Sequence, residues 1–183
     1  MSLPDIFVLR HGGTEWNREG RWQGALDSDL TNTWLMQAVA IGESLGAFGI
    51  SPESQRGTVS PQGRAWQRAE LALELLGITA TVIDDLREIE IGDWTGLPRD
   101  DIAVRCLDHG VETSPDIYRR APGGEGFEVL WERVGRVLAR LVQPTIIVSH
   151  AITSWFCGCA PFGFLRLRNG RAGGCSCGEA ALL

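Results

Sequence analysis

Four short runs with β-branched side chains, separated by segments with helical spacing, limit most strongly what this chain can fold into. The runs, each predicted as a strand, are residues 5–9, 57–60, 80–83 and 145–148. Amphipathic helices are predicted over residues 30–48, 62–76 and 125–141. Because strands that alternate with helices form parallel sheets covered on both faces, the sequence predicts an α/β fold, a three-layer αβα sandwich with a mainly parallel central sheet.

The predicted helices have recognisable ends and apolar stripes. Thr31 is the expected N-cap of the first helix, and Gly77 is expected to end the second. The side chains expected to face the core are Leu35, Val39, Leu45 and Phe48 in the first helix and Phe127, Leu130, Val134, Leu138 and Leu141 in the last.

Two parts of the chain have weaker patterns. Glycines and prolines break residues 84–124 into turns, with one short helix expected near 100–107, and a connection of this length is typical of a lid or binding loop over a site. The C-terminal part, residues 152–183, is atypical. With 183 residues, the whole chain fits a single domain, 1–183, with a sizeable core.

Within the C-terminal part, the pair Asn169-Gly170 suits a tight hairpin turn after a strand at 164–168, and a last strand is expected at 179–183. Two C-x-C units also lie near this end and leave open a small metal-binding module. Zinc ligands more often have C-x-x-C spacing, so we expect no metal. The four cysteines are Cys157, Cys159, Cys175 and Cys177.

Charge and hydropathy exclude several classes of protein. The net charge of −6, from 17 basic and 23 acidic residues, argues against a general nucleic-acid binder. The first ten residues lack the apolar stretch of a secretory signal, and no segment approaches the roughly 20 apolar residues of a membrane span. We therefore predict a cytoplasmic protein without a nucleic-acid or membrane partner.

Basic and polar residues follow three of the predicted strands. Arg10-His11 ends the first strand, Ser60 ends the second with Arg64 one turn later, and His150 follows the last. Ligands of parallel sheets bind at the carboxyl ends of the strands, and arginine offers phosphate oxygens a planar fork of donors. These side chains predict an anion pocket, to which the amide groups at the start of the helix near residue 62 could contribute.

A histidine in such a pocket can either donate hydrogen bonds to a phosphate or attack phosphorus as a nucleophile. Attack requires a neutral ring with one nitrogen held as a donor. The glycines beside His11 would let a backbone carbonyl approach and fix that form. The alternative is that His11 and His150 are unrelated structural histidines.

Five motifs of the chain resemble, in order and spacing, those of the histidine phosphatase superfamily, also called the phosphoglycerate mutase-like family. The motifs are LRHGGTEWN, SPQGRAWQRAE, LREIEIGDWTG, APGGEGFEVLWERV and VSHA. The resemblance spans residues 6–151 and implies the phosphoglycerate mutase-like form of the αβα sandwich.

The resemblance also implies roles for individual residues. His11 would be the nucleophile that becomes phosphohistidine, Arg10 and Arg64 would clamp the phosphoryl oxygens, and His150 would stabilise their developing charge. Glu88 would be the acid–base carboxylate. Further substrate-binding positions implied in this way are Asn17, Gln23 and Gly24.

The choice of Glu88 depends on the resemblance alone. Glu90 and Asp93 lie within five positions of it, and residue chemistry does not choose among the three carboxylates. Only the family spacing, a glutamate four residues before Gly92, selects Glu88.

The resemblance implies a metal-independent, cofactor-free phosphatase that acts on a phosphate ester of a small molecule or of a protein. Because the chain is compact, a phosphatase is favoured over a phosphoglycerate mutase-like transferase, and a non-catalytic binder of phosphorylated ligands is the third reading. The chain departs from the family pattern at Gly13, where glutamate or glutamine is usual, at Ala151, and in the short C-terminal part.

Overall fold

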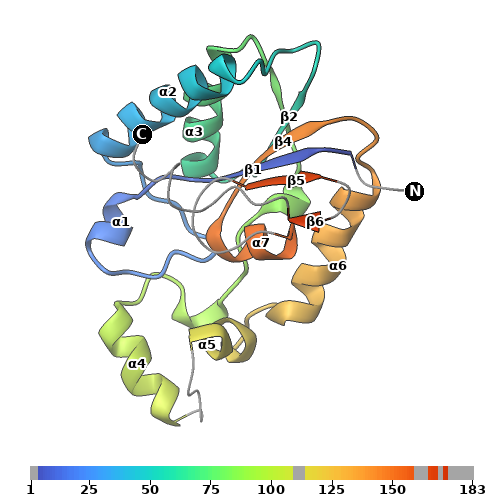
Figure 1. Ribbon diagram of the computed structural model, residues 1–183. Coiled ribbons are helices and arrows are strands. Elements are labelled where there is room, and N and C mark those ends of the chain that lie inside the picture. The colour runs from blue at the N-terminus through green and yellow to red at the C-terminus, as the bar shows by residue number, and fades with distance from the viewer. Residues whose placement is uncertain (1–3, 109–113, 159–164, 169–170, 173–183) are drawn as a thin grey trace.

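The computed structural model describes residues 4–108, 114–158, 165–168 and 171–172 (Figure 1). These residues form a six-stranded sheet with the order β3-β2-β4-β1-β5-β6. Its strands are β1 (Ile6–Arg10), β2 (Arg56–Val59), β3 (Ala80–Val82), β4 (Thr145–Ser149), β5 (Leu165–Arg168) and β6 (Arg171–Ala172). The first four are parallel, whereas β5 and β6 are antiparallel to their neighbours. The predicted mainly parallel sheet is confirmed.

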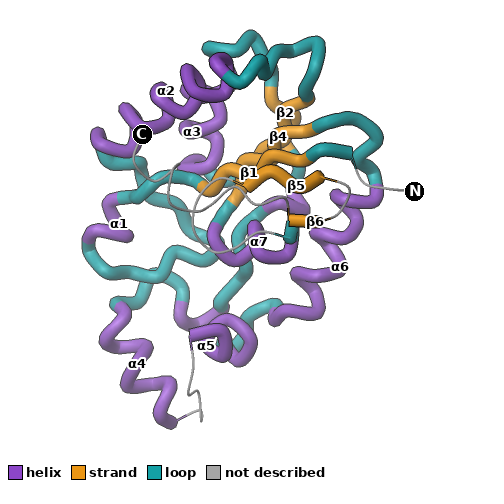
Figure 2. Tube along the Cα trace, viewed as in Figure 1, coloured by secondary structure: helices purple, strands orange, loops and turns teal. Residues whose placement is uncertain are grey.

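Helices cover both faces of the sheet, as Figures 1 and 2 show. One face carries α2 (Asn32–Ala47) and α3 (Gly63–Glu74), and the other carries α6 (Gly126–Ala139) and α7 (Ala151–Phe156). The remaining elements are α1 (Glu15–Arg18), the 3-10 turns η1 (Asp84–Leu86) and η2 (Gly92–Trp94), α4 (Arg99–Asp108) and α5 (Ser114–Arg120). The three-layer sandwich is therefore also confirmed.

Strand β1 shows how one segment serves both layers. Successive side chains of a strand point to opposite faces. Ile6 and Val8 accordingly enter the core under α6 and α7, while Phe7 and Leu9 enter the core under α2 and α3. Each of these buried side chains contributes about 1.5–3 kcal/mol, which holds the end of β1, where Arg10 lies, in a fixed place.

The apolar stripe predicted for the first helix is wrong in most positions. Of those side chains only Leu45 is buried, and Phe48 is 78% exposed. The buried line of α2 consists of Ala38, Gly42 and Leu45. A Cβ at Gly42 would lie 2.5 Å from the carbonyl oxygen of Ala72 in α3, so α2 packs through its small residues.

In the last predicted helix the stripe is confirmed. Leu130 and Val134 are buried, and the other three predicted side chains, partly buried, pack against the same core. The second helix ends before Gly77, whose φ of 68° lies in the left-handed region favoured by glycine.

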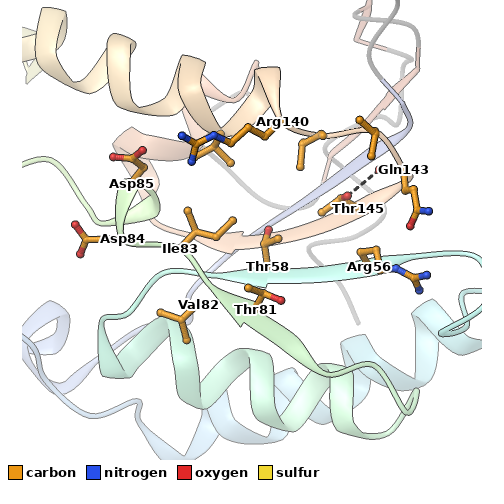
Figure 3. Close-up of a pocket in the computed structure, with 13 residues that line it drawn as sticks. Arg56, Thr58, Thr81, Val82, Ile83, Asp84, Asp85, Arg140, Gln143 and Thr145 are labelled. Atoms are coloured by element: carbon orange, nitrogen blue, oxygen red, sulfur yellow. Dashed lines mark hydrogen bonds between the residues drawn. The ribbon is translucent and has the colours of Figure 1, made fainter.

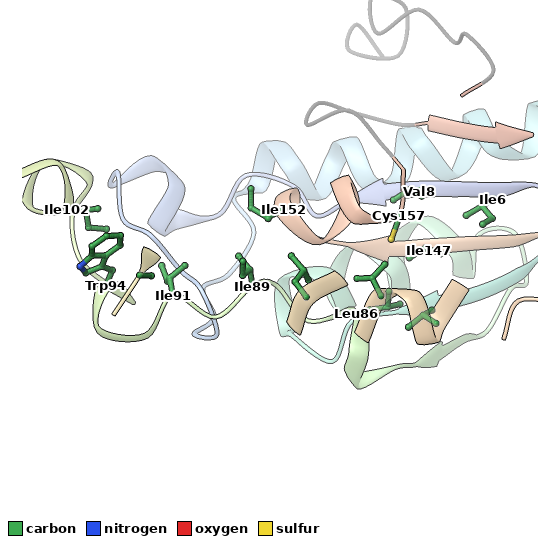
Figure 4. Close-up of a cluster of buried hydrophobic side chains, with 14 of the residues drawn as sticks. Ile6, Val8, Leu86, Ile89, Ile91, Trp94, Ile102, Ile147, Ile152 and Cys157 are labelled. Atoms are coloured by element: carbon green, nitrogen blue, oxygen red, sulfur yellow. The ribbon is translucent and has the colours of Figure 1, made fainter. Parts of the chain in front are cut away.

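Residues 84–108 and 114–124 have more regular structure than their pattern predicts. Their apolar side chains form a core that continues from the sheet to α4, as Figure 4 shows. Its members include Leu86, Ile89, Ile91, Trp94 and Ile102. The expected short helix is α4. The sequence pattern does not predict α5, because Pro115 interrupts it. Proline nevertheless suits the first turn of a helix, and Pro115 is the second residue of α5.

The C-terminal hairpin is confirmed by the pairing of Leu167 with Ala172 and of Arg168 with Arg171. The predicted turn at Asn169-Gly170 and the predicted strand at 179–183 lie outside the described residues. Within the described part of the chain, no helix is long and apolar enough to cross a membrane.

Candidate active site

The carboxyl ends of β1 and β4 bring the two histidines together. The amide of His11 donates to the carbonyl oxygen of Ser149 at 2.8 Å, and the ring centroids of His11 and His150 are 5.1 Å apart. Both rings are buried. The strand ends converge as the sequence predicts.

The His11 ring is held in one tautomer. Its Nδ1 lies 2.6 Å from the carbonyl oxygen of Gly12. Because a carbonyl only accepts, Nδ1 carries the proton and Nε2 keeps its lone pair. Burial, followed by the charges of Arg64 and Arg10, lowers the pKa of His11 well below its usual range, so the ring is neutral at neutral pH.

His150 is neutral for similar reasons, since burial and the charge of Arg64 lower its pKa well below the usual range. Its Nε2 lies 2.7 Å from Ser60 Oγ, and its buried Nδ1 has no partner among the described residues. Ser60 Oγ also accepts from the amide of Gln62 at 3.3 Å. The hydroxyl proton of Ser60 is therefore free to be donated to Nε2 of His150. The proton of the neutral His150 ring is then on Nδ1, which can donate toward the site.

Arg64 is fully buried and is held by the segment before α2. Its Nη1 donates to the carbonyl of Leu26 at 2.6 Å and to Asp27 Oδ1 at 3.1 Å, and its Nη2 donates to the carbonyl of Gly24 at 3.0 Å. The Nε–H has no partner in the described part of the chain. Arg64 thus retains the Nε–Nη2 edge, the edge that suits two phosphoryl oxygens.

At the start of α3, where we expected amide groups that could contribute to an anion site, the amide of Arg64 is engaged by an acidic side chain of the protein. The amide of Arg64 donates to Asp27 Oδ1 at 3.1 Å, and a Cβ at Gly63 would lie 2.5 Å from Asp27 Oδ2. The Asp27 carboxylate occupies this helix N-terminus and satisfies its dipole.

Arg10 is a cation of the site without a partner among the described residues. It is partly exposed, and its guanidinium forms no hydrogen bond or ion pair within the described part of the chain. Its charge contributes to the lowered pKa values of both histidines. Among the described residues, nothing competes with an anion for its N–H groups.

The three other predicted binding residues belong to the framework. Asn17 Oδ1 accepts from the amide of Thr14, in a capping box at the start of α1. Gln23 Nε2 donates to Thr14 Oγ1. The carbonyl of Gly24 accepts from Gln62 and Arg64. Each side chain or backbone group holds a site segment, and ligand contact by these residues stays a prediction.

Burial separates Glu88 from its rivals. Glu88 is 8% exposed, whereas Glu90 is half-buried and Asp93 is exposed. Of the three carboxylates, only Glu88 is positioned by the protein core.

The Glu88 carboxylate is bound by the N-terminus of α7, directly after His150. Its oxygens accept from the amides of Ile152 at 3.2 Å and Thr153 at 3.1 Å, and from Thr153 Oγ1 at 3.1 Å. The amide of Ile89 adds a bond at 3.0 Å. This arrangement fixes the carboxylate at the start of the helix that follows His150.

Sequence reasoning missed Gln62 and Asp27, which hold site residues, and gave Ser60 no role beyond its place at a strand end. It also did not single out Arg68, which lies on the same buried face of α3 as Arg64. Gln62 Oε1 accepts from the amide of Glu88 at 2.7 Å, so one side chain links Glu88 to Gly24. A signal existed for Arg68, because it follows Arg64 by four residues, the spacing that places two side chains on one face of a helix.

A groove of about 580 Å³ lies elsewhere, between the amino-terminal halves of β2 and β4, β3 and the end of α6 (Figure 3). The residues that line it include Arg56, Thr58, Thr81, Arg140 and Thr145, and none of them is a predicted site residue.

Among the described residues, no group of three or more His, Cys, Asp or Glu side chains is placed to hold a metal ion. Three cysteines of the C-x-C units lie outside those residues, so the metal-module alternative remains untested.

Residues 6–165 match the sequence profile of the histidine phosphatase superfamily, branch 1. The chain belongs to this superfamily. Proteins named probable phosphoglycerate mutase GpmB, from Salmonella newport and Salmonella dublin, are 31% identical to it over 161 residues, which cover 82% of this chain and 71% of theirs.

Two solved structures of the superfamily fold are similar to this one. A mycobacterial glucosyl-3-phosphoglycerate phosphatase, Rv2419c, has a TM-score of 0.72 and 26% identity, with 90% of this chain and 91% of that chain covered. The alpha-ribazole phosphatase from Shigella flexneri has a TM-score of 0.66 and 27% identity, with 82% and 75% covered.

Proposed function

We propose that this protein is a metal-independent phosphatase that hydrolyses phosphate monoesters through a phosphohistidine intermediate on His11. The observation that carries the proposal is the state of His11. The ring is neutral, its Nδ1–H is fixed by Gly12, its Nε2 keeps a lone pair, and it lies beside the His150 ring and near the charges of Arg64 and Arg10.

In the first step, the Nε2 lone pair of His11 attacks phosphorus and the bond to the ester oxygen breaks. Glu88 transfers its proton to that oxygen, so the product leaves as a neutral alcohol. Arg10, the free edge of Arg64 and the Nδ1–H of His150 stabilise the charge on the three equatorial oxygens.

In the second step, the Glu88 carboxylate removes a proton from water, and the resulting hydroxide oxygen attacks phosphorus. The P–N bond breaks, which releases inorganic phosphate and restores the neutral His11. Arg10 and Arg64 supply the positive charge that a metal ion supplies in other phosphatases, and the neutral His150 contributes an N–H donor.

The substrate class that follows is a phosphate monoester of a small molecule, with a phosphoprotein as the other source of the same group. Two similar structures are those of phosphatases that act on small phosphate esters, by their names. A phosphoglycerate mutase-like transferase is the second candidate, because the curated relatives carry that name at 31% identity.

Hydrolysis of para-nitrophenyl phosphate with a chelator present tests the proposal. We expect the wild type to release phosphate at a rate that the chelator does not change, and folded His11→Ala to be inactive. Activity that survives His11→Ala would contradict the mechanism. Phosphate binding without hydrolysis would identify a non-catalytic binder.

Incubation with a phosphoglycerate distinguishes phosphatase from mutase. The proposal predicts free phosphate and glycerate as products. Interconversion of phosphoglycerate isomers without phosphate release would assign the chain to the mutases.

A further inference from the structure

Arg68, in α3, is a buried arginine for which the described part of the chain provides no ion-pair partner. Its side chain is 5% exposed, and its Nε and Nη1 atoms are buried and bond to none of the described residues. Burying an uncompensated charge is costly, so a protein retains such a group when something else compensates it.

Another buried arginine shows how this protein treats a structural guanidinium. Arg133 is 3% exposed, and its Nη2 pairs with Glu125 Oε1 at 2.6 Å. Its Nη1 donates to the carbonyls of Asp85 and Arg87, both at 2.7 Å. Arg68, with equal burial, has no counterpart to these bonds.

The position of Arg68 points to the catalytic pocket. It lies one helical turn after Arg64, on the same buried face of α3. Burial and then the charge of Arg10 lower the pKa of Arg68 to about 10, and its own charge helps to lower the pKa of His11. Arg68 is therefore within electrostatic reach of Arg10 and His11, two of the groups that contact the phosphoryl group in the proposed function.

The charges of the site can balance two negative charges on a bound ligand. Arg64 is paired with Asp27, both histidines are neutral, and Glu88 carries a proton when it acts as the acid. Of the cations named in the site, Arg10 and Arg68 then have no ion-pair partner among the described residues, and a phosphate monoester dianion carries two negative charges.

We propose that Arg68 is a third anion-binding residue of this site, which with Arg10 balances the charge of a bound phosphoryl dianion. The inference rests on the proposed function only for the location of the phosphoryl group. It assigns to Arg68 a role that its neighbours within the protein do not explain.

Binding of inorganic phosphate, measured by titration calorimetry at constant pH and ionic strength, tests the proposal. Arg68→Met removes the charge and keeps the length of the side chain, and we expect phosphate to bind about 10- to 100-fold more weakly, as when a charge-assisted hydrogen bond is lost. Arg68→Lys, which retains the charge, should fall between Arg68→Met and the wild type.

Thermal unfolding without phosphate provides a second readout that separates binding from structure. Arg68→Met should unfold at a higher temperature than the wild type, because an uncompensated buried charge is removed. The matched control, Arg133→Met, should unfold at a lower temperature or fail to fold, because it leaves Glu125 and the carbonyls of Asp85 and Arg87 without their hydrogen-bond donor.

Equal phosphate affinity in Arg68→Met and the wild type would overturn the proposal, and so would a loss of stability or folding in Arg68→Met. Hydrolysis is assayed separately on the wild type. A wild type that binds phosphate but releases none from para-nitrophenyl phosphate would refute the proposed phosphatase and leave the test of Arg68 valid.

Discussion

Gly13, next to the site histidine, has a specific neighbour that explains why it is a glycine. The family usually has glutamate or glutamine at this position. A Cβ at Gly13 would overlap Nε1 of the Trp34 indole and lie 2.7 Å from its Cδ1. A Cβ at Gly12 would lie 2.7 Å from the Cβ of Trp34. Trp34, from α2, therefore covers both glycines and occupies the space of the missing side chain.

Gly13→Ala should destabilise the protein through this clash alone, because Gly13 does not adopt a positive φ. Overpacking of this kind costs about 1–3 kcal/mol. Trp34 is 37% exposed, so its ring can move partly aside, and we expect a loss of about 2 kcal/mol in the free energy of unfolding. This loss lowers the melting temperature by about 4–8 °C.

A double-mutant cycle, measured by urea denaturation, assigns the loss to Trp34. Trp34→Ala alone should cost about 3 kcal/mol. Gly13→Ala should add nothing further in that background, which gives a coupling energy of about 2 kcal/mol. The control is Gly135→Ala on the exposed side of α6, where a Cβ meets no atom within 4 Å and should stabilise the helix by up to about 1 kcal/mol.

The cycle has an outcome that would refute the explanation. If Gly13→Ala costs the same free energy with Trp34 present and absent, the indole is not the reason for the glycine. If Gly13→Ala is neutral in the wild type, the space beside Gly13 is open.

Two further predictions concern the histidines. Because burial lowers the pKa of His11, the unfolded chain takes up a proton below about pH 6.5 that the folded state does not, so stability is lost as the pH falls, by up to about 1.4 kcal/mol per pH unit. His11→Asn should have a shallower slope of unfolding free energy between pH 7 and 5, and equal slopes would argue against a neutral His11. Ser60→Ala removes the bond that orients His150 and should lower kcat about 10-fold with little change in folding. The control, Ser60→Thr, keeps the hydroxyl and should retain most of the activity. An unchanged kcat in Ser60→Ala would show that Ser60 does not orient the ring.

The sequence predicts those parts of the site that depend on strand order. Arg10, His11 and His150 come together because parallel strands end at one edge of the sheet, and periodicity alone reveals such strands. The choice of Glu88 required the family resemblance, and its burial agrees with that choice.

Other features depend on how closely helices dock, which periodicity does not report. Asp27 fills the start of α3, Trp34 covers Gly13, and Gly42 lets α2 approach the backbone of α3. Each contact joins residues that are distant in sequence, so no local pattern contains it.

The most direct test of the central claim is a search for phosphate on His11 during turnover. Para-nitrophenol leaves without help from an acid, so Glu88→Gln should be phosphorylated by para-nitrophenyl phosphate and then hydrolyse slowly. With radiolabelled substrate and rapid alkaline quenching, we expect close to one acid-labile phosphate per chain, located on the peptide that contains His11 and absent in His11→Ala. Turnover by the wild type without a labelled intermediate in either enzyme, or label on another residue, would contradict nucleophilic catalysis by His11.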